Sequence, residues 1–137
     1  MKYKLSMYRL RENRDMLPST FASLVGTTLY EHRFGPFFVT PMVVGIQNGK
    51  AVVCTYDSIG TQSTTETFLV GGTASKNFYT LCEAYYRDNL SSVDLESILS
   101  NVLVSGVDRD VLSGYGGLVY ILTADSLKST VLKTKMV

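Results

Sequence analysis

The fold of this chain is decided by the stretch Met42-Val-Val-Gly-Ile-Gln-Asn-Gly-Lys-Ala-Val-Val-Cys-Thr-Tyr56. Two runs rich in β-branched residues flank Asn48 and Gly49, and Asn-Gly between such runs is the strongest short-range signal for a hairpin turn. We therefore expect antiparallel strands over 42–46 and 51–56. A further short strand is expected over 66–70.

Helical periodicity surrounds these strands on both sides. Upstream, apolar spacing predicts a helix over 3–12 and a second one from a cap at Ser19 or Thr20 to about Arg33. Downstream, it predicts a helix over 74–87 and another that Ser91 caps, followed by strands over 118–123 and 127–133. The order α-α-β-β-β-α-α-β-β indicates an α+β fold in which helices cover antiparallel sheets. We expect one domain over residues 1–137.

Composition excludes several classes of function. The net charge is +1 with no basic run, so we expect no nucleic-acid partner. The longest apolar runs fall far below the roughly 20 residues that span a bilayer, so we expect no membrane partner. Two cysteines without CxxC spacing predict free buried thiols in a reducing compartment, and a single histidine argues against a zinc site, so we expect no metal site.

The stretch from Gly106 to Gly117, Gly-Val-Asp-Arg-Asp-Val-Leu-Ser-Gly-Tyr-Gly-Gly, leads from the fourth helix into an apolar strand. It places a carboxylate, Asp110, three residues before a hydroxyl, Ser113. This pair could hold a nucleophile in place, because a poised nucleophile needs nearby hydrogen-bond partners. Alternatively, both residues only form the turn. His32 leaves a Ser–His–Asp arrangement open on composition alone, although no Gly-x-Ser-x-Gly elbow accompanies it.

Three segments together resemble a known family. They are Leu29-Tyr-Glu-His-Arg-Phe-Gly-Pro36 followed by Pro41, Cys54-Thr-Tyr-Asp-Ser-Ile-Gly60, and Val107-Asp-Arg-Asp-Val-Leu-Ser-Gly114. Their order and spacing resemble the beta subunits of the eukaryotic 20S proteasome, and the combination is most similar to the third, non-catalytic type. The resemblance extends over essentially the whole chain.

The resemblance implies an αββα sandwich of the amino-terminal-nucleophile hydrolase class, assembled into stacked seven-membered rings. Active members of that family use a processed amino-terminal threonine, which this sequence lacks together with the strands that carry it. We therefore expect an incomplete sandwich whose sequence begins inside the family's first helix. The resemblance implies a chain that catalyses nothing itself, uses no cofactor, and joins other alpha and beta subunits in ATP- and ubiquitin-dependent protein degradation in the cytoplasm and nucleus.

The same resemblance implies roles for five residues. Asp110, Ser113 and Ser75 match positions that support the nucleophile in active members, and here we expect them to be vestigial. A simpler alternative for Ser75 is a place in the first turn of the third helix. Asp57 and Thr61 match a loop that lines the substrate pocket of the adjacent trypsin-like subunit, where a carboxylate favours basic side chains. The alternative is a solvated loop aspartate.

Two further expectations concern surfaces. The aromatic residues Phe34, Phe37 and Phe38 either pack under the sheet or contact another subunit. Uncovered sheet edges and faces predict that the isolated chain self-associates or rearranges its first helix. Two other readings of the function remain open, namely an independent small serine-type hydrolase using Ser113, and a non-enzymatic binding module.

Overall fold

The computed structural model describes residues 1–134, which form four helices and five strands in the expected order. The α+β class predicted from the sequence is confirmed. The chain divides into two compact units, Met1–Glu66 and Thr67–Val137. That the whole chain forms one domain stays a prediction.

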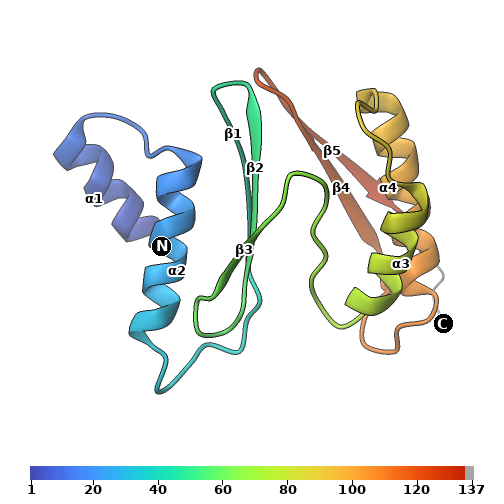
Figure 1. Ribbon diagram of the computed structural model, residues 1–137, viewed down its shortest axis with the longest axis horizontal. Helices are drawn as coiled ribbons and strands as arrows, with labels where there is room; N and C mark the ends of the chain where they lie inside the picture. Colours follow the sequence, from blue (N-terminus) through green and yellow to red (C-terminus); the bar gives the residue numbers. More distant parts are fainter. Residues whose placement is uncertain (135–137) are drawn as a thin grey trace. The chain divides into compact units, whose positions relative to one another are not determined.

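The first unit pairs two helices with a three-stranded antiparallel sheet (Figure 1). Its elements are α1 (Lys2–Glu12), α2 (Pro18–Glu31), β1 (Met42–Gln47), β2 (Lys50–Tyr56) and β3 (Gln62–Thr64). The strands follow the order β1-β2-β3, and α2 packs against both β1 and β2. The remaining helix of the unit is α1, and Asn13, the residue that follows it, adopts the left-handed conformation.

The β1–β2 hairpin forms as the Asn-Gly signal predicts. Asn48 and Gly49 both have positive φ, 52° and 75°, which matches the right-handed twist of the strands that they join. Gln47 pairs with Lys50 across this turn. The prediction of a tight two-residue hairpin is confirmed.

A small apolar core joins α2 to the sheet. Positions three and four apart on α2 place one face of the helix on the strands, as helical periodicity requires. The buried members of this core are Ala22, Val25, Leu29, Val43, Cys54 and Tyr56.

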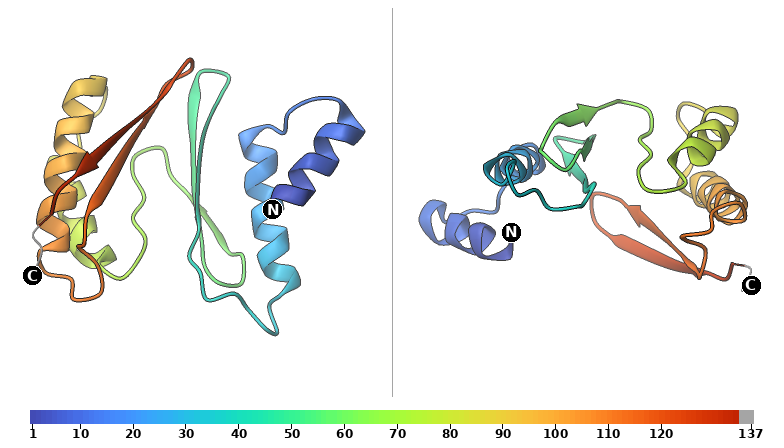
Figure 2. Two further views of the ribbon diagram at one scale, coloured as in Figure 1. Left: turned by 180° about the vertical axis from the view of Figure 1, so that it is seen from behind. Right: turned by 90° about the horizontal axis from the view of Figure 1, so that it is seen from below.

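The second unit pairs two helices with a hairpin. Its elements are α3 (Ser75–Tyr85), α4 (Ser92–Val107), β4 (Gly117–Leu122) and β5 (Leu127–Leu132). Both views in Figure 2 show α3 and α4 on the same side of the β4–β5 hairpin. The helix α4 packs against β4, and α3 packs against α4.

Two sequence-based predictions within these units are wrong. Residues 66–70 do not form a strand, because the partner of β2 comes earlier: Tyr56 pairs with Gln62 directly after a short loop. Neither Ser19 nor Thr20 caps α2, which begins at Pro18. The backbone N–H of Ser19, which a cap would satisfy, donates instead to Oε1 of Gln47 at 3.2 Å.

Candidate functional site

A carboxylate with two hydroxyl donors lies at the exit of α4. Ser113 Oγ and Thr73 Oγ1 each donate to Oδ2 of Asp110, both at 2.6 Å. The other carboxylate oxygen, Oδ1, accepts from the backbone N–H of Leu112 at 3.2 Å. The structure therefore brings together Asp110 and Ser113, as the sequence suggested, and adds a third residue from another segment.

The end of α4 positions this cluster. The backbone N–H of Asp110 donates to the carbonyl of Val107, the last residue of α4, at 3.1 Å. Gly114 has a φ of 121°, a conformation that residues with a side chain rarely adopt, and this lets the chain turn back after α4. Thr134 Oγ1 also donates to the carbonyl of Gly114. The loop that carries Ser113 is thus held at both ends.

The hydrogen bonds of the cluster weaken its basicity. Donation by Ser113, then by Thr73, then by the backbone of Leu112 lowers the pKa of Asp110 below its usual value. A carboxylate that already accepts three hydrogen bonds is a poor general base, because a general base works best when its own pKa lies near the operating pH. The cluster is therefore suited to holding a loop or orienting a neighbouring group rather than to activating its own serine.

Ser75 lies outside the cluster. It is the first residue of α3, and its backbone N–H donates to the carbonyl of Gly72 at 3.3 Å. The hydroxyl that reaches Asp110 belongs to Thr73, two residues earlier. Sequence reasoning missed Thr73, although the Gly71-Gly72 punctuation before it signalled that the chain turns there.

His32 makes local contacts at the end of α2. Its Nδ1 lies 3.0 Å from the carbonyl oxygen of Thr28, one helical turn earlier. Its ring packs 4.7 Å, centre to centre, from the ring of Phe37. These contacts give His32 a structural explanation that needs no catalytic partner.

The second candidate site is the loop of residues 57–61 between β2 and β3. Oδ1 of Asp57 accepts from the backbone N–H groups of Thr61 at 2.7 Å and Ile59 at 3.1 Å. Two backbone bonds of 3.2 Å, from Asp57 to the carbonyl of Thr61 and from Gly60 to the carbonyl of Asp57, close the loop. Asp57 is thus a solvent-exposed residue whose carboxylate is hydrogen-bonded within its own loop.

Asp57 is exposed and charged at neutral pH. Hydrogen bonds from the side chain and backbone of Thr61 are the main cause that lowers the pKa of Asp57. The carboxylate consequently presents a fixed negative charge at the surface. Such a charge can attract a basic group without any rearrangement of the loop.

Aromatic side chains project beside the end of α2. Phe34 and Phe38 are 90% and 96% exposed, so they do not pack under the sheet of this unit. The guanidinium of Arg33 lies 4.5 Å from the ring centres of both Tyr30 and Phe34. Aromatic residues and arginine are enriched at protein interfaces, which favours the subunit-contact alternative.

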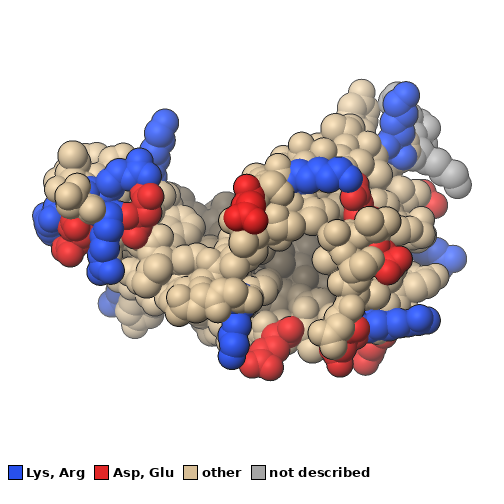
Figure 3. Space-filling model, turned by 90° about the horizontal axis from the view of Figure 1, so that it is seen from above, with Lys and Arg blue, Asp and Glu red and all other residues tan. Residues whose placement is uncertain are grey.

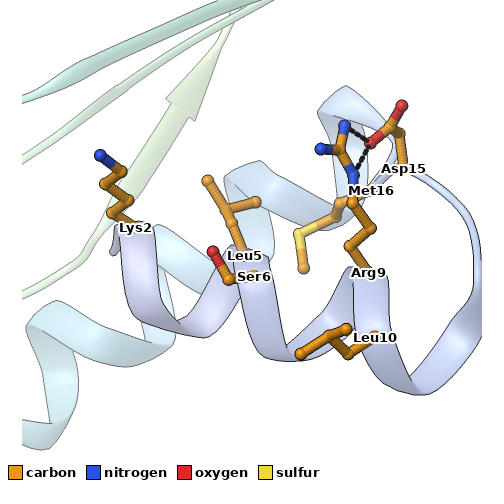
Figure 4. A pocket seen from close by; sticks show the side chains of 7 residues that line it. All are labelled: Lys2, Leu5, Ser6, Arg9, Leu10, Asp15 and Met16. Carbon is orange, nitrogen blue, oxygen red and sulfur yellow. Dashed lines mark hydrogen bonds and ion pairs between the residues drawn. The ribbon is translucent and has the colours of Figure 1, made fainter.

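A hollow of about 500 Å³ lies along α1 (Figure 4). At one end of it the guanidinium of Arg9 points to Asp15, with Nε 2.7 Å from Oδ1. Basic side chains gather over α1 in Figure 3, and Lys2 lies at the other end of the hollow. None of the site residues expected from the sequence lines this hollow. Its lining residues are Lys2, Leu5, Ser6, Arg9, Leu10, Asp15 and Met16.

Metal ligands and membrane-spanning helices are not found in the described part of the chain. Within residues 1–134 no three His, Cys, Asp or Glu side chains lie close enough to share a metal ion. None of the helices in the same range has the length and apolar character to cross a bilayer. Cys54 and Cys82 are free thiols, the first buried and the second half-buried.

Comparison with known proteins identifies relatives along nearly the whole sequence. The family described as "Proteasome subunit" matches residues 1–122. The chain is 46% identical over 135 residues to "Proteasome subunit beta type-3-A" of Arabidopsis thaliana, covering 98% of this chain and 66% of that protein. It is 42% identical over 136 residues to "Proteasome subunit beta type-3" of Saccharomyces cerevisiae, with the same coverage of 98% and 66%. The chain thus spans slightly less than two thirds of the length of these relatives.

Proposed function

The chain belongs to the proteasome subunit family, and we propose that it acts as a non-catalytic, structural beta subunit of the 20S core, contributing to ATP- and ubiquitin-dependent protein degradation. The observation that carries this proposal is its similarity to beta type-3 subunits over 98% of the chain. The αββα sandwich of amino-terminal-nucleophile hydrolases is the fold that membership implies, in part, for this chain. Its place of action is then the cytoplasm and nucleus.

The hydrogen bonds around Asp110 support the proposal that Ser113 is not a catalytic nucleophile. Asp110 is occupied by hydroxyl donors from Thr73 and Ser113, and its lowered pKa makes it a weak base. A serine hydroxyl attacks a carbonyl only when a base takes its proton. Ser113 donates to a carboxylate here, and within residues 1–134 no imidazole or amine is hydrogen-bonded to its hydroxyl. We propose that Asp110, Ser113 and Ser75 are vestigial support positions.

Apolar surface supports a role in assembly. On β4, Leu118, Tyr120 and Leu122 alternate along one face and are all exposed, and Val131 pairs with Leu118 on the same face. Large exposed apolar patches typically mark contacts with other proteins. We propose other alpha and beta subunits as the partners, with no nucleic acid and no membrane. For the same reason, the isolated chain self-associates.

Asp57 and Thr61 are proposed to line the substrate pocket of an adjacent subunit. The support is the fixed, exposed carboxylate at the centre of the loop, which is already ionised and needs no ordering when a basic substrate arrives. A single surface charge contributes about 1 kcal/mol at a distance of 4 Å in a water-like dielectric. The proposed effect is therefore a modest preference for basic side chains.

Assembly is tested by tagging the full-length gene product in its own cells. We expect the tagged chain to elute with a particle of proteasome size, and its co-purified partners to be alpha and beta subunits by mass spectrometry. A covalent inhibitor that labels amino-terminal threonines should modify partner chains and leave this one unmodified. Recovery of the chain only as a free monomer, or labelling of the chain itself, contradicts the proposal.

The pocket role is tested with Asp57→Asn in the assembled particle. The amide keeps an oxygen that can accept from Ile59 and Thr61 but carries no charge, so the loop is preserved while its charge is removed. We expect KM for peptides with a basic cleavage-site residue to rise about five-fold, from the ~1 kcal/mol charge contribution, with kcat unchanged. Asp125→Asn, in the β4–β5 turn, is the matched control. An unchanged KM in Asp57→Asn refutes the pocket role.

A further inference from the structure

The loop of residues 57–61 rests directly on helix α2. An ideal Cβ built on Gly60 would overlap the carbonyl oxygen of Gly26 and lie 3.2 Å from both its carbonyl carbon and the Cβ of Leu29. Real Cβ atoms essentially never come so close to backbone, so no side chain fits at residue 60. The backbone of the loop and the backbone of the helix are therefore in direct contact at this point.

Gly60 is also required by its backbone conformation. Its φ is +90°, a region that glycine enters without penalty and other residues rarely adopt. The close contact and the positive φ are independent demands, and they coincide at one position. Because only glycine satisfies both requirements, residue 60 fixes the position of the loop against α2.

Tyr56 provides a second attachment immediately before the loop. Its hydroxyl donates to the carbonyl oxygen of Ala22 in α2 at 2.6 Å, and the side chain is only 2% exposed. Its ring packs beside Gly26, since a Cβ there would lie 3.3 Å from Cε1 of Tyr56. The residue before Asp57 and the third residue after it are thus both tied to the same turn of α2.

We propose that Gly60 is the positioning residue of the Asp57 loop: its contact with Gly26, together with the Tyr56–Ala22 hydrogen bond, sets the place on α2 from which the Asp57 carboxylate is presented. The consequence for an adjacent substrate pocket rests on the proposed function of Asp57. The attachment of the loop to α2 does not, because it depends only on contacts within the first unit. The specificity of a neighbouring subunit is then set in part by the backbone of α2.

The test compares Gly60→Ala with Gly49→Ala in the full chain, purified in its native assembly. Gly49 also has positive φ, +75°, but a Cβ there meets no atom within 4 Å, so this control carries the backbone strain without the overlap. Hydrogen exchange at the amides of Ile59 and Thr61 reports the loop directly. We expect exchange there to rise by about ten-fold or more in Gly60→Ala and to change little in Gly49→Ala.

Steady-state kinetics of the same particles report the consequence. We expect Gly60→Ala to raise KM for basic peptides about as much as Asp57→Asn does, with kcat within about two-fold of wild type. A general loss of folding would lower kcat for all substrates instead. Unchanged amide exchange in Gly60→Ala overturns the positioning role, whatever the kinetics show.

The two proposals fail separately. If Asp57→Asn leaves KM unchanged while Gly60→Ala frees the amides, the pocket role is wrong and the positioning role stands. If Asp57→Asn raises KM while Gly60→Ala alters neither exchange nor KM, the positioning role is wrong. Should Gly60→Ala fail to fold, Tyr56→Phe removes only the second attachment, and unchanged exchange at Ile59 and Thr61 in that variant then overturns the proposal.

Discussion

The hydroxyl of Thr73, just before α3, donates a 2.6 Å hydrogen bond to the carboxylate of Asp110, just after α4. This bond joins segments 37 residues apart and meets the bond from Ser113 on the same oxygen. In the second unit, hydrogen bonds to Asp110 therefore join the start of α3 to the end of α4. The ionisation state of Asp110 makes the stability of the unit depend on pH.

Asp110→Asn should remove a part of the acid sensitivity of folding. The pKa of Asp110 is lowered from its ordinary value of 3.8, chiefly by Ser113 and then by Thr73. Since the folded pKa lies below the unfolded one, the carboxylate contributes its full stability above about pH 4 and loses it as the pH falls through the folded pKa. We expect wild type to lose more stability than Asp110→Asn between about pH 4 and pH 2, measured by urea unfolding followed by circular dichroism.

The control for this measurement is Asp125→Asn, an exposed carboxylate in the β4–β5 turn. It should follow the wild-type acid profile. Parallel profiles for wild type and Asp110→Asn would show that the hydrogen bonds to Asp110 do not favour its charged form.

Tyr56→Phe should destabilise the first unit. The phenol hydroxyl is buried and donates to Ala22, and burial is the main cause that raises the pKa of Tyr56 to about 12. Removing the hydroxyl deletes one buried hydrogen bond, which costs about 1–2 kcal/mol in the free energy of unfolding. Tyr30→Phe, at a tyrosine more than half exposed on α2, should change the free energy of unfolding by less than about 0.5 kcal/mol in the same urea titration. Equal effects of the two variants would contradict a structural role for the Tyr56–Ala22 bond.

Most helices and strands of this fold could be predicted because the signals for turns and helix caps depend on only a few neighbouring residues. Asn48-Gly49 specifies a turn through the φ of two residues, and Ser91 specifies a helix start through one hydrogen bond. The position of β3 could not be read in this way. Gln62–Thr64 is exposed along its length and carries no apolar alternation, so only its pairing with β2 makes it a strand.

The candidate site shows the same division. Asp110 and Ser113 lie three residues apart on one turn, so their contact follows from the sequence around them. Thr73 joins them only because α3 packs against α4. Likewise, Asp57 is recognisable as a loop carboxylate, but the contact between Gly60 and Gly26 depends on the packing of α2 against β2. Such contacts are set by tertiary structure, which no short spacing in the sequence records.

Ser91→Ala should weaken the start of α4. Ser91 Oγ accepts from the backbone N–H of Asp94 at 3.2 Å, which confirms the cap predicted from the sequence. Without it one of the free N–H groups of the first turn loses its partner, at a cost of about 1 kcal/mol in the free energy of unfolding. Ser92→Ala, one residue later and inside the helix, should cost less than half as much. A ranking in the opposite order, measured by urea unfolding, would refute the capping role.

Gly106→Ala tests the packing of α3 on α4. A Cβ at residue 106 would overlap the ring of Phe78, lying 2.5 Å from its Cδ1 and 2.8 Å from its Cζ. Alanine favours a helix by up to about 1 kcal/mol over glycine, whereas overpacking costs about 1–3 kcal/mol. Phe78 is half-buried on α3, which packs against α4. We expect the overlap to prevail and the free energy of unfolding to fall by about 1–2 kcal/mol. Ser105→Ala, exposed on the same turn, gains helix propensity without any overlap and should be neutral or slightly stabilising. If Gly106→Ala instead stabilised the chain, the Phe78 ring would be able to move away from residue 106 without loss of stability. The prediction of a tight contact between α4 and Phe78 would then be wrong.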